Sequence, residues 1–386
     1  MSQGNNAPRY YQADEQHSPE HKHSGSEEHA HFQRPHRDNH QLELGVTEVA
    51  EGRADVARQV AISGGLANSA FRAKWQMYRP EWVSALFAEM TGVIFFTVYG
   101  QMSTASYVFG SAEEMPGLGS VLQIGLAYAL GITFAITVAA MSSGGHFHPA
   151  ITICQVIFKG FPLRKAPLYI LAQLVGGFVA SLITYACNKE AMAQLELGLR
   201  ATGKTAQIFS SAGPAGIIAL FPPANRSYGE MFANEFFAAF FIGLVIWACL
   251  DGQNIFVSPT VVPYTIGIAF GATIWGWISG GVALNTARDV GARFACGAIY
   301  GTECFPPQYS ALAALTNIFS TLCAVAIYTF ILSDSRRPPA PVALGHLVEH
   351  EREAHLHATR THDELVEKRG EPNGLVRRLT TKQSMQ

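Results

Sequence analysis

Charged residues are scarce in this chain, at 15% of its 386 positions, and they gather toward its two ends. The middle therefore lacks the polar surface of a water-soluble globule. It contains long apolar stretches instead, and crossing a hydrocarbon core takes about 20 such residues. An all-α membrane protein with six transmembrane helices is predicted, at Trp82–Gly100, Val121–Ser142, Pro167–Ala186, Met231–Leu250, Val262–Ile278 and Ser310–Leu332.

Metal-binding and redox patterns are also lacking. The six cysteines follow no zinc or thiol-redox spacing, and four of them fall within or beside apolar runs as small buried residues. Cys296 and Cys304 could meet on the outer face. Nothing outside the two ends assembles a nucleophile, a base and an orienting partner. We therefore expect no enzyme, no metal, no cofactor and no nucleic-acid partner.

The two ends of the chain are short of apolar residues. Residues 1–78 and 335–386 have too little apolar surface to offset the entropy of ordering. We expect a disordered N-terminal tail, a membrane domain at 79–334, and a disordered or partly helical C-terminal tail. The first 20 residues carry no apolar h-region, so the first span is expected to act as its own insertion signal.

Basic residues flank some membrane ends and avoid others. Arg72 and Lys74 precede the first span, and Arg336 and Arg337 follow the last one. The loop predicted at Gln101–Ser120 contains no lysine or arginine. By the positive-inside rule both termini are predicted to be cytoplasmic, in a multi-pass protein that we place in the plasma membrane.

The two halves of the chain repeat each other. Ala88-Glu89 in the first span corresponds to Asn234-Glu235 in the fourth, and each half has a polar loop, at Ser143–Ala150 and Ser279–Asp289, after a long apolar run. Three spans per half place the two copies in opposite orientations. A polar loop at bilayer depth is tolerated where it lines a water-filled cavity. The pattern predicts a pore between two re-entrant half-helices.

Two acidic residues lie inside predicted spans, where an ionisable group is costly and often functional. Glu89 and Glu235 occupy matching places in the two halves. We interpret them as supports that accept hydrogen bonds from the backbone of their own loops, in preference to a proton relay. His146, in the first loop, is placed with them as a supporting residue.

The loops resemble those of the major intrinsic protein family, the aquaporins and aquaglyceroporins, over Glu81 to Leu332. Ser-Gly-Gly-His-Phe precedes the first triplet, and Arg288 follows the second. Family members carry Asn-Pro-Ala in each loop, so His148 and Thr286 depart from the pattern. The residues of the two triplets, expected at the pore centre, are His148, Pro149, Ala150, Asn285, Thr286 and Ala287.

This resemblance implies an aquaporin-like fold and a passive channel for water and small uncharged solutes such as glycerol, assembled as a homotetramer in the lipid bilayer. Two helix N-termini facing each other carry partial positive charge, which repels cations and orients a water molecule by its oxygen. A neutral His148 imidazole could still donate a hydrogen bond to a passing oxygen. An imidazolium there is disfavoured, which suggests reduced conduction in acid.

The outer constriction is placed by counting back from the triplets, as in the family. Strict water channels of the family typically have a histidine where Thr273 stands, so this filter is expected to be wider than a water-only one. The selectivity filter implied by the resemblance consists of Tyr128, Thr273, Val282 and Arg288.

Asp289 and Arg293 resemble the arrangement of aquaglyceroporins. Asp289 suits the dipole in the first turn of the second half-helix and can pair with Arg293 four residues later. Asn225, in the loop between spans three and four, fits the N-glycosylation acceptor pattern.

Three other functions stay open at this stage. A strict water channel would share the same fold, and a secondary transporter would also use inverted repeats but would need a coupling ion. A non-conducting junction or sensor protein, in which the tails act, is compatible with the altered triplets.

Overall fold

The computed structural model describes residues 75, 78–115, 117–277 and 281–334. They all belong to one unit of the chain, Asn39–Gln386. The two tails predicted from the sequence lie outside the described residues except for residues 75 and 78, as do residues 278–280, where the fifth span was expected to end and the second loop to begin.

The described part of the membrane domain is built from helices. The long ones are α3 (Glu81–Ala112), α4 (Val121–Ser143), α6 (Ala166–Ala201), α8 (Tyr228–Cys249), α9 (Val262–Trp277) and α11 (Pro307–Ile327). Two half-helices follow the polar loops, α5 (Pro149–Lys159) and α10 (Thr286–Tyr300). Short elements complete the fold: η3 (Thr205–Phe209), α7 (Pro214–Ile218), η5 (Thr302–Cys304) and the π-helix η6 (Tyr328–Leu332).

Five of these helices are long and apolar enough to cross a membrane, with α11 and η6 counted together. The helix α9 takes the place of the predicted fifth span and has 16 described residues, which corresponds to about 24 Å of helix. The predicted all-α fold of six spans and two half-helices is confirmed.

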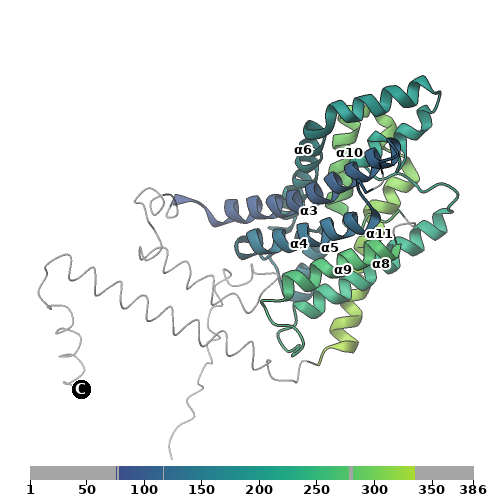
Figure 1. The fold of residues 1–386 in the computed structure, drawn as a ribbon. Helices are drawn as coiled ribbons and strands as arrows, with labels where there is room; N and C mark the ends of the chain where they lie inside the picture. Colours follow the sequence, from purple (N-terminus) through teal and green to yellow (C-terminus); the bar gives the residue numbers. More distant parts are fainter. Residues whose placement is uncertain (1–74, 76–77, 116, 278–280, 335–386) are drawn as a thin grey trace, which may run out of the picture. The chain divides into compact units, whose positions relative to one another are not determined.

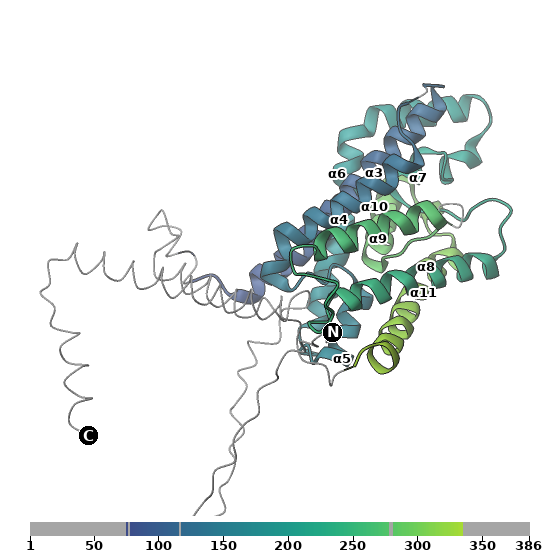
Figure 2. The same ribbon diagram turned by 60° about the horizontal axis from the view of Figure 1, so that its bottom comes forward.

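The two halves pack in the same way. The first half contributes α3, α4, α5 and α6, and the second contributes α8, α9, α10 and α11 in the same order. Helix α3 packs on α4 and α6, as α8 packs on α9 and α11. Each half-helix contacts the last span of both halves, and α4 lies beside α9 where the halves meet (Figures 1 and 2). This packing is that of an inverted repeat.

Small residues allow the closest helix contacts. A Cβ atom on Gly177 of α6 would lie 2.4 Å from the carbonyl oxygen of Ala287 in α10, and one on Gly267 of α9 would lie 2.4 Å from that of Ala129 in α4. Neither backbone oxygen can move aside. These two glycines therefore allow helix pairs to approach more closely than any side chain would permit.

The helices α3 and α6 are longer than the predicted spans. The segment Gln101–Ser120, expected to be a loop, is helical as far as Ala112. The reason is that its polar groups find partners within the fold: the buried Gln101 amide donates to Ser181 Oγ at 2.8 Å and to the Ile218 carbonyl at 2.9 Å. The extensions of α3 and α6 enclose a second apolar core with η3 and α7.

A disulfide joins Cys296, near the end of α10, to Cys304 in η5. Both residues are fully buried in the second apolar core. The pairing that the sequence left as a possibility is present, and it fixes the segment between α10 and α11 against the extended ends of the spans.

Removing this disulfide should lower stability. The loop that it closes is short, so chain entropy predicts that Cys296→Ser with Cys304→Ser costs about 2 to 3 kcal/mol. Thermal unfolding of the purified protein in detergent measures the effect, and Cys187→Ser, at an exposed free cysteine, serves as the control. An equal unfolding temperature for the double variant and the native protein would contradict this role.

Candidate functional site

The first polar loop is held by a buried carboxylate on α3. Glu89 is fully buried, and its two oxygens accept the backbone N–H groups of His146 at 3.0 Å and Phe147 at 2.7 Å. The amide of Gln173 on α6 donates to the same carboxylate at 2.7 Å. The loop can lie at bilayer depth because its bare N–H groups have strong acceptors.

The second loop repeats this arrangement. Glu235 on α8 is 1% exposed and accepts the N–H groups of Ala283 at 2.6 Å and Leu284 at 2.8 Å. The amide of Asn317 on α11 approaches it at 3.3 Å. The sequence indicated both carboxylates but not Gln173 and Asn317. The feature that could have indicated these two is that each is a polar residue within the apolar last span of its half.

His148 is the N-cap of the first half-helix. Its Nδ1 accepts the backbone N–H of Ala150 at 3.0 Å, so Nδ1 carries no proton and Nε2 does. Nε2–H in turn donates to the carbonyl oxygen of Leu284 in the opposite loop at 2.9 Å. Both ring nitrogens are thereby occupied. The expected hydrogen bond from this ring to a passing oxygen has no free N–H.

Asn285 caps the second half-helix in the same way. Its side-chain oxygen accepts the N–H groups of Ala287 at 2.9 Å and Arg288 at 3.2 Å. Its amide nitrogen donates to the carbonyl oxygen of Phe147 at 2.9 Å. An amide nitrogen carries two hydrogens, so one N–H of Asn285 stays available.

The two caps therefore tie the loops to each other. Each capping side chain donates to the carbonyl of the residue that precedes the other cap, Phe147 or Leu284. These two residues have positive φ angles of 47° and 60°, an uncommon conformation for a side-chain-bearing residue. The strained backbone at both positions is held by the carboxylates and by the crossed hydrogen bonds.

Thr286 stands at the first position of α10, where proline is expected. Its hydroxyl oxygen lies 2.7 Å from Asn317 Oδ1 and 2.9 Å from the Ala314 carbonyl oxygen, and its one hydrogen is shared between these two acceptors. Proline could make neither bond. The departure from the family triplet thus adds a direct link between the second half-helix and α11.

His146 contributes more than its backbone to the first loop. Its ring lies 4.7 Å from the Phe161 ring and 5.1 Å from the Tyr169 ring, between centroids. Its Nδ1 lies 3.1 Å from Thr152 Oγ1 in α5. The residue connects the loop to the half-helix that follows.

The second half-helix carries the predicted ion pair. The guanidinium of Arg293 binds both carboxylate oxygens of Asp289, at 2.8 and 2.9 Å, and both side chains are buried. Arg293 also donates to the Cys304 carbonyl at 3.2 Å and lies over the ring of Tyr309, 5.3 Å from its centroid. The pair thus joins the first turn of α10 to the disulfide segment.

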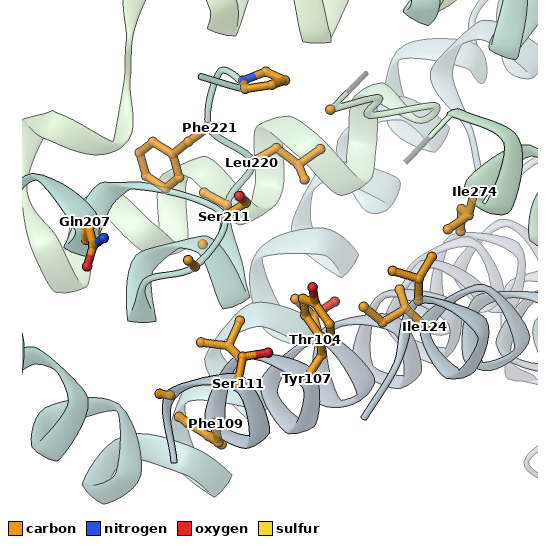
Figure 3. Close-up of a pocket in the computed structure, with 18 of the residues that line it drawn as sticks. Thr104, Tyr107, Phe109, Ser111, Ile124, Gln207, Ser211, Leu220, Phe221 and Ile274 are labelled. Atoms are coloured by element: carbon orange, nitrogen blue, oxygen red, sulfur yellow. The ribbon is translucent and has the colours of Figure 1, made fainter. Parts of the chain in front are cut away.

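Two cavities meet at the crossed loops. The larger, of about 990 Å³, opens between α3, the end of α6 and the α7 segment, and Figure 3 shows Thr104 and Ser111 of α3 across it from Ser211 and Leu220. The smaller, of about 50 Å³, lies beside the first loop and is lined by His146 and His148. Both cavities are lined by Phe96, Ile132, Phe270 and Asn285.

The structure brings three of the four predicted filter residues to the larger cavity. Tyr128, Val282 and Arg288 line it. Thr273 is buried, its hydroxyl group donates to the Ala269 carbonyl of its own helix at 2.8 Å, and it is not among the residues found to line either cavity in the described part of the chain. Phe270 and Ile274 of α9 line the larger cavity, and sequence reasoning missed both.

This site lies between the halves of an inverted-repeat membrane protein: it has two cavities with shared lining residues and a capped half-helix from each half. The architecture defines a class of membrane channels. The major intrinsic protein family model matches residues 76–333, and the chain belongs to this family.

Several relatives agree with this assignment. An aquaporin of Laccaria bicolor is 42% identical over 72% of this chain and 93% of its own length, and Aquaporin-3 of Laccaria bicolor is 43% identical over 66% and 78%. Aquaglyceroporin-2 of Rhizophagus irregularis is 32% identical over 64% and 76%. The solved aquaglyceroporin from Plasmodium falciparum has a similar fold, with a TM-score of 0.55 and 22% sequence identity. The match covers 65% of this chain and 97% of the aquaglyceroporin chain. The chain is a membrane channel for water or small solutes, and it is not an enzyme.

Replacing either loop carboxylate by its amide should destabilise the fold. In Glu89→Gln or Glu235→Gln an NH₂ group would replace one of the two acceptors and leave a buried N–H unpaired, at a cost of about 1 to 3 kcal/mol. The unfolding temperature in detergent measures this. Glu190→Gln, at an exposed position on α6, should change little. Native-like stability of both loop variants would indicate that the carboxylates do not support the loops.

Proposed function

We propose that this channel passively conducts water and small uncharged solutes such as glycerol through the passage that joins the two cavities. The observation that carries the proposal is the crossed pair of caps, which fixes two half-helix N-termini at one point of the passage. The six triplet residues are then the central site, and Tyr128, Thr273, Val282 and Arg288 are the filter region.

Electrostatics at this point favours neutral solutes. Each half-helix presents about half a positive charge at its N-terminus, and Arg288 adds a permanent charge beside the second one. Cations meet this field without a compensating acidic group: the carboxylates of Glu89 and Glu235 bind the loop backbone, and Asp289 is paired with Arg293. A neutral molecule passes this barrier without the penalty that a cation incurs.

Proton exclusion would rest on one donor. Asn285 retains an N–H that can orient the oxygen of a passing water, whereas His148 has both ring nitrogens engaged. A water held by its oxygen at the centre interrupts the hydrogen-bonded chain along which protons hop. Only one of the two caps supplies a free donor, but a single oriented water molecule is enough to interrupt the chain.

Glycerol is favoured by an amphipathic wall. Phe96, Ile132, Phe270 and Ile274 contribute apolar surface to the larger cavity, and Arg288 contributes polar groups to the same cavity. A small polyol has a carbon backbone on one side and hydroxyl groups on the other, which matches such a wall. The Asp289 and Arg293 pair is consistent with the aquaglyceroporin arrangement.

A strict water channel is the nearest alternative, and transport coupled to an ion gradient is less well supported. In the described part of the chain, the acidic residues buried within the membrane domain all have backbone or arginine partners. A coupling ion would have to displace those partners. A non-conducting junction or sensor protein would need no passage between the cavities.

The membrane orientation is part of the proposal. Lys159, Arg164 and Lys165 lie at the end of α5 and the start of α6, and this basic face would be cytoplasmic with both termini. The disulfide lies in the core at the far ends of α3 and α6, as suits an oxidising exterior. We place the protein in the plasma membrane as a homotetramer, with exposed Asn225 as an outer glycosylation acceptor.

Flux measurements test the proposal. Reconstituted vesicles should show water and glycerol permeability without dependence on an ion gradient. Thr273→His should lower the glycerol-to-water ratio about tenfold, because the larger ring would extend from this buried position into the large cavity and narrow it. Thr265→His is the matched control, since Thr265 lies eight residues earlier, near the start of α9, and its hydroxyl group likewise donates to the carbonyl four residues before it. Vesicles no more permeable than empty ones would refute conduction.

Acid should reduce conduction through His148. Protonating Nδ1 would oppose its hydrogen bond from Ala150 N–H and add charge beside two positive helix ends. We expect water permeability to fall toward the acidic end of a pH 7 to pH 4 titration, since the neutral ring is held by two bonds. The other titratable groups in or against this loop, among the described residues, are Glu89, His146 and Tyr169.

His148→Asn separates His148 from those neighbours. A shorter amide can cap α5 as Asn285 caps α10, and it adds a free N–H at the centre. The variant should conduct water at least as well as the native channel at pH 7 and lose the acid response. A native channel with flat permeability across the titration would contradict the proposed role of the ring.

A further inference from the structure

Helices α3 and α6 are longer than a membrane requires. With 32 and 36 residues they rise about 48 and 54 Å, whereas a hydrocarbon core is about 30 Å thick. Their last turns line one part of the larger cavity together with the segment that follows α6 (Figure 3). We call the part of this cavity that is lined by Glu113, Gln194, Gly198, Lys204 and Gln207 the outer cleft.

The fold leaves the polar side chains of the outer cleft unused. On the same stretch of α6, Glu196 and Arg200 pair with each other at 2.7 Å. Four side chains that line the cleft have no hydrogen bond or ion pair among the described residues: Glu113, Gln194, Lys204 and Gln207. Free donors and acceptors from three successive parts of the chain therefore converge on one cavity.

The floor of the outer cleft is apolar, and there is room above it. Phe109, Leu195 and Leu199 line the same cavity and pack against the second apolar core, which holds them in place. A Cβ atom on Gly198 would meet no other atom within 4 Å. Open space over apolar side chains, with a few polar groups at its edge, is the usual composition of a small-molecule site.

The two charges of the cleft indicate the class of ligand. A simple anion would be attracted by Lys204 but repelled by Glu113, and a simple cation would meet the reverse. A hydroxyl group both donates and accepts, so it can bond either charged group and either amide. Sugars and long-chain polyols carry a row of hydroxyl groups, and their C–H groups suit the apolar floor.

We infer that the outer cleft binds sugars and long-chain polyols, and that its occupation reduces flux through the passage. The cleft belongs to the same cavity as Asn285 and Arg288, so a ligand held there lies on the path of solutes. A ligand that is too large for the smaller cavity of about 50 Å³ stays in the cleft and acts as a reversible blocker. The effect on flux rests on the proposed function, whereas binding does not.

Saturation-transfer NMR of sorbitol with the purified full chain tests binding, in a detergent without a sugar headgroup. The native chain should give a saturable signal. Gly198→Phe should abolish it, because the ring would fill the open part of the cleft. Ala193→Phe, at an exposed position of α6 outside the lining, is the control. Lys204→Ala with Gln207→Ala should weaken binding severalfold, and Lys189→Ala, also exposed and outside the lining, controls for the lost charge.

Water flux in reconstituted vesicles tests the blocking effect. Sorbitol is present at equal concentration on both sides, and a salt gradient supplies the osmotic drive. The water permeability of the native channel should then fall severalfold as sorbitol approaches saturation. The permeability of Gly198→Phe should stay at that variant's own value without sorbitol, which also controls for viscosity.

The outcomes separate this inference from the proposed function. Vesicles no more permeable than empty ones would refute conduction, while binding is measured independently. No sorbitol signal from the native chain, or an equal signal from Gly198→Phe, would overturn the inference and leave conduction in place. Competition by glycine betaine, which carries both charges and no hydroxyl group, would overturn the assignment to polyols. Sorbitol binding with unchanged flux would overturn the blocking effect.

Discussion

The structure depends on two buried carboxylates that bind backbone N–H groups. An unpaired N–H inside a membrane costs several kcal/mol, and each polar loop has two of them facing Glu89 or Glu235. The loops could not lie between the spans without these acceptors. The positions of the half-helices and their caps follow from that placement, because each half-helix starts directly after a loop that a carboxylate holds. The two cavities lie against these same loops.

The crossed caps convert two separate loops into one unit. Because His148 and Asn285 each bond the opposite loop as well as their own helix, neither half-helix can shift without breaking a bond in the other half. The imidazole and the amide fulfil this structural task equally. They differ in the number of free N–H donors, since the Asn285 amide keeps one N–H and the His148 ring keeps none. The symmetric scaffold therefore has an asymmetric centre.

Much of this was predictable from the sequence, for physical reasons. Span length, the duplication and the placement of Glu89 and Glu235 follow from hydrophobicity and from the cost of burying charge. The helical continuation of α3 past Gln101 was missed because it depends on partners 80 and 117 residues away. The orientation of the Thr273 hydroxyl group, which donates to the carbonyl of Ala269, depends on side-chain packing that spacing alone cannot encode.

The scaffold is built from bonds to backbone groups, which explains how the triplets can vary. The carboxylates and caps act on backbone groups, so His148 and Thr286 are accommodated wherever a cap and a first-turn hydroxyl group find partners. The contact between Tyr128 and Arg288 is separate from this scaffold and joins the two halves through side chains alone. The lining of the large cavity is thus free to vary while the loops keep their support.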